Sequence, residues 1–214
     1  MIGLVQGNAK NIPLAGESVD MIFTDPPYPR EYLLCYSWLA AEAMRVLKPG
    51  GFVLAMTGGL YLNKIYRVFD DAGLTYFFEM THKHGNGDAP TVWTGHNERE
   101  TPYPIVARTK PIITYSKGAS WPRIGGVMNF FESQGGSKRY HHWGQDVESA
   151  RYYIDYFSER GDLVLDPFVG GGTTAVACEL IGRRFVGMDI DREAINISAL
   201  RVSGAEIKTQ ATLL

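Results

Sequence analysis

Short apolar runs alternate with longer stretches of helical periodicity along this chain. Apolar runs bounded by turn residues are typical of buried strands, whereas apolar positions three and four residues apart are typical of helices. The pattern predicts strands at 2–6, 19–24, 51–57, 74–80, 104–109, 162–167 and 184–190, and helices at 31–47, 60–72, 146–159, 173–181 and 191–200. The alternation predicts an α/β fold with a doubly wound, mostly parallel sheet of seven strands.

The middle of the chain departs from this pattern. Turn-rich segments such as "GNGDAP", "TPYP" and "SQGGSK" break any long element between 82 and 145. We therefore expect 1–80 and 141–214 to be two halves of one domain. We expect 81–140 to be a small irregular insertion with one or two edge strands.

Charge and aromatic residues single out the same middle segment. Residues 82–145 hold eight Lys/Arg against four Asp/Glu, which is +4, so the net charge of −2 leaves −6 for the rest of the chain. All five histidines and three of the four tryptophans also lie there. A basic, aromatic segment on an acidic body is typical of a nucleic-acid contact surface, and equally of a solvated insertion loop.

Composition excludes several classes of protein. The two cysteines, Cys35 and Cys178, make neither a disulfide framework nor a zinc motif, and no apolar run approaches the length of a membrane span. His82, His84 and His96 lack neighbouring ligands at metal-binding spacing, so we expect no metal site. We expect a cytoplasmic protein without membrane contact.

A glycine-rich loop follows the strand predicted at 162–167. In "LVLDPFVGGGTTAVACELIGRRFVGMDID" (163–191), Gly170, Gly172 and Ala175 satisfy the pattern G-x-G-x-x-A. Asp189 ends the next predicted strand, 19 positions after Gly170. This arrangement brings a ligand against bare backbone at a helix N-terminus and places an acid within reach of ribose hydroxyls.

Three adenosine-containing ligands compete for this loop. A phosphate-cradling loop requires a lysine after the glycines, and none is present. A dinucleotide is disfavoured because Asp166 would lie close to a doubly negative pyrophosphate. S-adenosylmethionine is favoured, since it offers a ribose diol to Asp189, an ammonium and a sulfonium towards Asp166, and no phosphate.

The stretch "TDPPYPREYL" (24–33) ends another predicted strand with an acid and two prolines. Neither proline has a backbone N–H, so the loop offers the Asp25 carboxylate and backbone carbonyls as acceptors. An exocyclic amino group has two N–H donors that match the Asp25 carboxylate and the Pro26 carbonyl. Accepting both would help the nitrogen attack a sulfonium methyl group, and Tyr28 offers a ring face for the base. We expect the two loops to face each other if strands 19–24 and 162–167 are neighbours at a topological switch point.

With "DPPY" before "DPFVGGGTT", the chain resembles the amino-group DNA methyltransferases of the permuted (β) arrangement. The resemblance implies a Rossmann-like methyltransferase sheet, with a catalytic half at 1–80 and a cofactor half at 141–214. It implies a catalytic set of Asp25, Pro26, Pro27 and Tyr28. For S-adenosylmethionine it implies Asn8, Asp25, His141, Gln145, Asp166, Phe168, Gly170, Gly172, Thr173, Thr174 and Asp189.

Two positions depart from the family pattern. Asn8 stands where the family usually has an acid that accepts from the adenine of the cofactor, so we expect weaker cofactor affinity. "HHWGQ" (141–145) lacks the Lys-Pro that commonly follows this segment. His82 is the residue we assign to the aromatic base-stacking position.

The resemblance makes DNA the partner and base flipping the mode of access. Candidate contacts to it lie in the insertion, a candidate target-recognition region: His82, Lys83, Arg99, Arg108, Lys110, Arg123, Lys138 and Arg139. Because the insertion is short, a short recognition sequence, a homodimer and modest specificity all stay open.

The first residue of "DPPY" points to adenine N6, because a serine at that position goes mostly with cytosine N4 in this family. The alternatives are cytosine-N4 DNA methylation, RNA base methylation and a non-catalytic nucleic-acid-binding scaffold of the same fold. An NAD(P)-dependent oxidoreductase is disfavoured by Asp166 beside the glycines.

Overall fold

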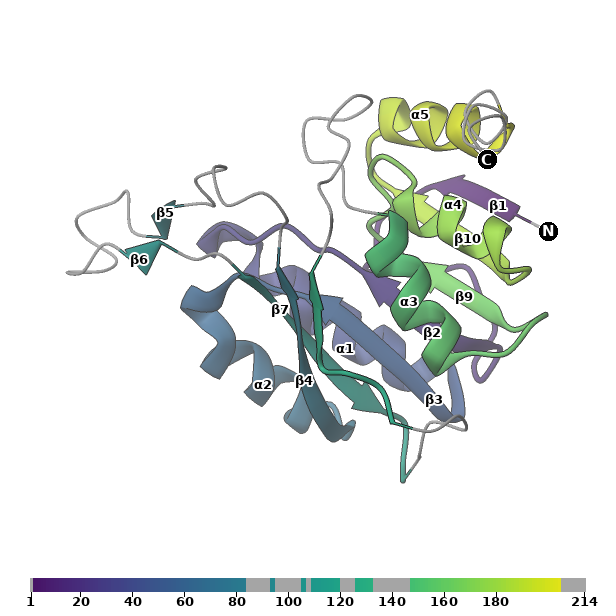
Figure 1. Ribbon diagram of the computed structural model, residues 1–214. Coiled ribbons are helices and arrows are strands. Elements are labelled where there is room, and N and C mark those ends of the chain that lie inside the picture. Colours follow the sequence, from purple (N-terminus) through teal and green to yellow (C-terminus); the bar gives the residue numbers. More distant parts are fainter. Residues whose placement is uncertain are drawn as a thin grey trace.

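The computed structural model describes residues 2–83, 93–94, 105–106, 109–119, 126–132 and 147–204. Within these ranges an eight-stranded sheet has the order β1-β10-β9-β2-β3-β7-β4-β8, and β5 pairs with β6 separately (Figure 1). The strands are β1 (Ile2–Gln6), β2 (Val19–Thr24), β3 (Leu47–Met56), β4 (Thr75–Lys83), β5 (Trp93–Thr94), β6 (Ile105–Val106), β7 (Thr109–Ser116), β8 (Phe130–Glu132), β9 (Leu163–Asp166) and β10 (Arg184–Asp189). Neighbouring strands of the large sheet are parallel except at β7, which is antiparallel to β3 and β4.

Helices cover both faces of this sheet. They are α1 (Leu33–Val46), α2 (Leu62–Asp71), α3 (Val147–Phe157), α4 (Thr173–Leu180) and α5 (Arg192–Val202), with 3-10 turns at Arg30–Tyr32 and Gly59–Tyr61. α1 and α2 pack on one face, and α3 and α4 on the other (Figure 1). The predicted α/β class is confirmed, and all five predicted helices are present with shifted ends.

The two apolar cores follow from the alternation of side chains along β3. Phe52, Leu54 and Met56 point into the core under α3 and α4, whereas Val53 and Ala55 point into the core under α1 and α2. A parallel strand that is covered on both faces must be apolar at every position. This explains why "FVLAM" is a continuous apolar run.

The strand predicted at 104–109 is confirmed only in part. β6 covers only Ile105–Val106, and the long strand of this region is β7, which lies inside the large sheet between β3 and β4. Pro111 lies within β7 opposite Thr81, and its carbonyl accepts from the backbone N–H of Thr57 at 2.9 Å. A proline argues against a central strand because it donates no ladder hydrogen bond, which is why the pattern did not indicate β7. Residues 109–116 therefore belong to the sheet rather than to an insertion.

Two further differences concern strand number and boundaries. The sheet has eight strands instead of the predicted seven, because the short edge strand β8 pairs with β4. β3 begins at Leu47, directly after α1, and its register against β2 shifts between Val19 and Met21. The "KPGG" segment thus ends the helix as predicted, but it lies within the bulged start of β3.

The topological switch point lies between β9 and β2. These strands are parallel neighbours, with Met21 opposite Val164 and Ile22 opposite Leu165. The chain continues from β9 through α4 to β10 on one side, and from β2 through α1 to β3 on the other. The predicted neighbourhood of the two strands is confirmed, so the loops after Thr24 and Asp166 leave the sheet side by side.

Candidate active site

The loop after β2 presents the carboxylate of Asp25, which contacts Tyr28 and Lys110. Tyr28 Oη donates a hydrogen bond to Asp25 Oδ1, and Lys110 Nζ lies 3.4 Å from Asp25 Oδ2. Burial of the Tyr28 phenol, together with the charge of Asp25 and the hydrogen bond to it, raises the pKa of Tyr28 well above its usual range. Tyr28 therefore stays protonated and acts as a donor that orients Asp25.

Lys110 reaches this loop from the start of β7. Its ammonium group lies 5.1 Å from the centroid of the Tyr28 ring as well as beside the Asp25 carboxylate. The sequence placed Lys110 among the nucleic-acid contacts, 85 residues away from Asp25 along the chain. The structure brings it into the centre of the candidate active site.

The carboxylate of Asp166, at the end of β9, points into the protein beneath the glycine loop. Thr24 Oγ1 donates to Asp166 Oδ1 at 2.6 Å, and Thr174 Oγ1 donates to Asp166 Oδ2 at 2.6 Å. Asp166 is 3% exposed, and burial raises its pKa to about 6 against the opposing effect of these hydrogen bonds. This placement differs from the expected carboxylate facing an ammonium group, because hydroxyl donors and burial hold the side chain inside the protein.

The glycine loop is shaped by left-handed backbone and braced by α5. Gly170 has φ 46° and Gly172 has φ 78°, which side chains disfavour. A Cβ on Gly172 would lie 2.9 Å from Ser198, whereas a Cβ on Gly170 would meet only the Phe168 carbonyl, at 3.9 Å. Gly172 is thus required by helix packing, and Gly170 leaves its side of the loop open to a ligand.

Two α5 side chains hold the carbonyls of this loop. Ser198 Oγ donates to the Gly170 carbonyl at 2.8 Å, and an Arg201 guanidinium N–H donates to the Gly171 carbonyl. The N–H groups of Gly170 and Gly172 also have partners within the protein, the Asp189 carboxylate and the Val169 carbonyl, so the loop is held on both sides. Thr173 is buried at that helix start, and Arg201 also lies 3.4 Å from its hydroxyl.

Asp189 ends β10 beside the glycine loop. One of its carboxylate oxygens accepts from the Gly170 N–H at 2.9 Å, and the other accepts from the Asp191 N–H at 2.9 Å. A carboxylate has about four lone-pair positions, so it can accept further bonds from hydroxyl donors. Ile190 follows directly and is 70% exposed, so an apolar side chain adjoins the acid on the protein surface.

Asn8 lies at the same edge of the sheet. Gly7, which precedes it, donates its N–H to the Asp189 carbonyl at 2.9 Å. The Asn8 side chain is exposed, and its amide oxygen accepts from the Lys10 N–H at 2.9 Å. The predicted cofactor residues Asn8, Asp189 and Gly170 are therefore neighbours, although they come from three different segments.

These residues fit S-adenosylmethionine by their chemistry. The loop offers bare backbone at Gly170, an acid at Asp189 and apolar surface at Ile190, which match an adenosine group. The described residues of the loop carry no lysine, and the charged groups that contact it are two carboxylates, Asp166 and Asp189, and one guanidinium, Arg201, which leaves a net negative charge. Negative charge at this place suits a cation better than a pyrophosphate.

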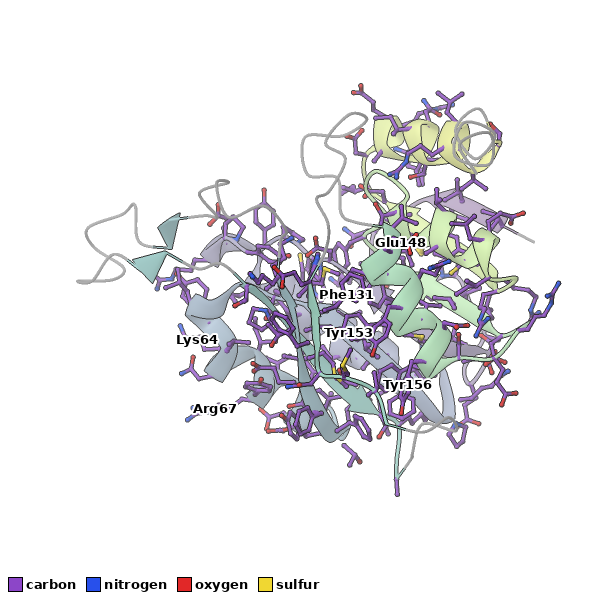
Figure 2. All side chains as sticks on the ribbon, in the orientation of Figure 1. Lys64, Arg67, Phe131, Glu148, Tyr153 and Tyr156 are labelled. Carbon is purple, nitrogen blue, oxygen red and sulfur yellow. The ribbon has the colours of Figure 1, made fainter. Side chains whose placement is uncertain are left out.

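The predicted nucleic-acid contacts have varied placements. His82 has no exposed surface, and its ring lies 6.2 Å from that of Phe131, so it does not offer a stacking face to a base as expected. The rings of Phe131 in β8 and Tyr153 in α3 lie close to each other (Figure 2). Tyr153 Oη also donates to the carbonyl of Thr81, the residue before His82, at 3.3 Å, so α3 and β8 together cover His82. Lys83 Nζ lies 2.5 Å from Glu132.

Several predicted residues lie outside the described ranges: His141 and Gln145 of the cofactor set, and Arg99, Arg108, Arg123, Lys138 and Arg139 of the nucleic-acid set. Phe168 is described, and its backbone N–H donates to Asp166 Oδ1 at 3.1 Å. Pro26 is buried and Pro27 is half-buried between Asp25 and Tyr28.

Sequence reasoning missed four residues that build the site. Thr24 was visible as the residue before "DPPY", and Ile190 as the apolar residue after Asp189, so a local signal existed for both. Ser198 and Arg201 had no signal, because they are 28 and 30 residues from their partners and lie in an ordinary helical pattern.

No helix in the described part of the chain is long and apolar enough to cross a membrane. Those same residues contain no group of three or more side chains suited to hold a metal ion.

The chain resembles known proteins in both sequence and fold. The chain is 28% identical over 221 residues to the type II methyltransferase M.HpaI of Haemophilus parainfluenzae, covering 88% of this chain and 69% of that protein. It is 28% identical over 258 residues to the DNA adenine methyltransferase YhdJ of Escherichia coli (strain K12), covering 94% of this chain and 83% of that protein.

Solved structures share the fold. An M1.HpyAVI–SAM complex superposes with a TM-score of 0.73 at 22% identity, covering 94% of this chain and 99% of that chain. The cytosine-N4-specific PvuII DNA methyltransferase superposes with a TM-score of 0.78 at 18% identity, covering 94% and 86%. The sequence model of the N6/N4 methyltransferase family, described as DNA methylase, matches residues 19–200. With both loops at the switch point and a family match over most of its length, this chain belongs to the N6/N4 family of DNA methylases.

Proposed function

We propose that this protein transfers a methyl group from S-adenosylmethionine to the exocyclic N6 of an adenine flipped out of DNA. The observation that carries the proposal is the hydrogen bond between Thr24 and Asp166, 2.6 Å long, which joins the two loops. Asp25 follows Thr24 directly, so the acceptor carboxylate lies next to the loop suited to the methyl donor.

The cofactor half would hold the donor through contacts that the described residues can make. Asp189 would accept from the ribose hydroxyls, Ile190 would pack on the adenine, and Asn8 would accept from an adenine N–H through its amide oxygen. Asp166 supports this pocket through Thr174 rather than touching the donor with its carboxylate. We place His141 and Gln145 in the same pocket by the family resemblance alone.

Bound S-adenosylmethionine supplies a methyl group on a positively charged sulfur, and the C–S bond breaks as the new N–C bond forms. Asp25 would accept one N–H of the target amine, and the Pro26 carbonyl the other. These bonds leave the nitrogen lone pair directed at the methyl carbon, and the carboxylate stabilises the positive charge that develops on nitrogen. The excess proton then leaves the amine for Asp25 or water.

Adenine is favoured over cytosine by Asp25 itself. In this family an aspartate at the first position of "DPPY" goes mostly with adenine N6, and a serine goes mostly with cytosine N4. The likeness to YhdJ over 94% of the chain supports the same choice.

Transfer of tritium from labelled S-adenosylmethionine to unmethylated genomic DNA, followed by nucleoside digestion, tests the proposal. We expect the label in N6-methyladenine. Label in N4-methylcytosine would move the substrate to cytosine, and label only in RNA would exclude DNA. Cofactor binding without transfer to either nucleic acid would indicate a non-catalytic scaffold.

Asp25→Ala tests the role of the carboxylate. We expect turnover to fall by at least about a hundredfold, because the variant loses the group that stabilises the developing charge. Affinity for S-adenosylmethionine, measured by calorimetry, should change little. Asp71→Ala, at the exposed end of α2, serves as the control and should keep both values. Turnover of Asp25→Ala close to wild type would contradict the assigned role.

A further inference from the structure

Lys110 occupies the place that the proposed function reserves for the target base. Its Nζ lies 3.4 Å from Asp25 Oδ2 and 5.1 Å from the centroid of the Tyr28 ring. The Lys110 side chain is 19% exposed and that of Asp25 is 24% exposed, so the pair lies in a recessed position. An ammonium group that donates to the carboxylate and covers the ring makes the same two contacts as an amino base.

Tyr28 also packs against Gly58. A Cβ on Gly58 would lie 3.2 Å from Tyr28 Cβ and 3.5 Å from Tyr28 Cγ. Gly58 therefore allows the tyrosine to pack closely on the segment that follows β3. A base stacked on the ring face that Lys110 covers would need the place of its ammonium group, so the two cannot be there together.

Charge also requires Lys110 to leave before transfer. Methylation places positive charge on the amine nitrogen, next to Asp25. A lysine ammonium beside the same carboxylate neutralises it and repels that developing charge. Unless Lys110 moves, the group that should stabilise the reaction is already paired.

The arriving DNA brings a counter-charge for the displaced lysine. Lys110 lies at the second position of β7, opposite His82 of β4, at the end of the sheet where the acceptor loop leaves it. A flipped nucleotide keeps its two flanking phosphates near the mouth of the pocket. A flexible ammonium on a four-carbon stem is suited to move from a carboxylate to a phosphate.

We propose that Lys110 is a positioning residue that pairs with Asp25 in the absence of DNA and moves to a target-strand phosphate when the base enters. It thereby couples exposure of the acceptor carboxylate to occupation by nucleic acid. The inference rests on the proposed function, since it assumes a base acceptor at Asp25. If Lys110 acts in this way, full activity requires the charge of the DNA backbone as well as the base.

The test compares Lys110→Met with the wild type on two oligonucleotides. One has an ordinary backbone, and the other has neutral methylphosphonates on both sides of the target base. Methionine keeps an apolar stem of similar length and removes the charge. Rates of methyl transfer and the salt dependence of DNA binding are measured for each protein.

We expect the wild type to be the faster protein on the charged oligonucleotide and Lys110→Met to be the faster one on the neutral oligonucleotide. On charged DNA the variant should have the lower kcat/KM, because it loses a phosphate contact, and its salt slope should fall by about one. On the neutral oligonucleotide the variant should be faster than the wild type by about tenfold, the range of coupling between neighbouring groups. Lys110→Arg keeps the charge and should behave like the wild type on both.

Lys48→Met is the matched control, because Lys48 forms a comparable pair with Asp20 at 2.6 Å, away from the acceptor loop. Its kcat/KM should change by the same factor as that of the wild type between the two oligonucleotides. If Lys110→Met were slower on both oligonucleotides by one factor, Lys110 would only support Asp25, and the inference would be overturned. Equal rates of Lys110→Met and wild type on both would overturn it as well. Absence of transfer by the wild type to charged DNA would instead reject the proposed function.

Discussion

A single buried carboxylate links the two loops of the candidate active site. Asp166 accepts hydrogen bonds from two threonine hydroxyls and one backbone N–H, and its pKa is nevertheless raised to about 6 because burial outweighs them. A carboxylate with a raised native pKa binds its proton more tightly in the folded state than in the unfolded state. Its contribution to stability is therefore present at low pH and is lost as the pH rises through about 6.

Asp166→Asn should remove this dependence. Between about pH 4 and pH 6, the wild type should lose up to about 1.4 kcal/mol of unfolding free energy per pH unit relative to the variant. Above that window the difference should be constant. Urea unfolding at several pH values measures it, with the exposed Asp71→Asn as the control for general pH effects. A difference that does not change between pH 4 and pH 7 would show that Asp166 titrates normally.

In the cofactor half, helix α5 holds the glycine loop in place through hydrogen bonds and packing. α5 supplies a hydroxyl and a guanidinium to the loop carbonyls, and Gly172 lies against the Ser198 backbone. The glycine pattern therefore reflects helix packing at Gly172 as much as ligand access at Gly170. Substitutions at Gly172 and at Gly170 should therefore differ in their effects on stability and on ligand binding.

Gly172→Ala and Gly118→Ala separate strain from packing. Both glycines have φ 78°, but a Cβ on Gly118 would meet nothing within 4 Å, whereas one on Gly172 would lie 2.9 Å from Ser198. Each alanine should cost about 1–2 kcal/mol for its left-handed backbone. Gly172→Ala should lose about 1–3 kcal/mol more through overpacking, and should weaken cofactor binding. Chemical unfolding and calorimetry with S-adenosylmethionine give both values, and equal losses in the two variants would argue against α5 as a brace.

In the whole molecule, the two halves of the chain meet where β9 pairs with β2, and we call this boundary the seam. The Thr24–Asp166 bond crosses this seam between residues 142 positions apart, whereas Thr174–Asp166 stays within one half. Both bonds are 2.6 Å long. The two threonines therefore allow coupling between the halves to be measured against coupling within one.

Thr24→Val and Thr174→Val should each lower the unfolding free energy by about 1–3 kcal/mol, because Asp166 loses a donor. Their functional effects should differ. Thr24→Val should mainly reduce methyl transfer, since Thr24 precedes Asp25, and Thr174→Val should mainly reduce cofactor affinity. Titration calorimetry and single-turnover rates distinguish the two, and an identical pattern in both variants would mean that the seam does not couple the loops.

The sequence by itself determined, to within a residue, where β2, β9 and β10 end and which chemistry is placed there. Prolines, glycines and short apolar runs act over a few residues, so "DPPY", the glycine loop and Asp189 were legible from local pattern. The same rules misplaced β7, because Pro111 counts against a strand although its place in this sheet is tolerated. The family resemblance indicated His82 as a base contact, although it is buried against Phe131.

Only the tertiary structure decided which side chains meet. Lys110 reaches Asp25 across 85 residues, and Arg201 reaches the glycine loop across 30, and no local propensity encodes such pairs. Strand order and helix packing bring them together, because the sheet must bury apolar residues on both faces. The identity of the reaction therefore follows from two short motifs, whereas the control of Asp25 by Lys110 depends on the fold.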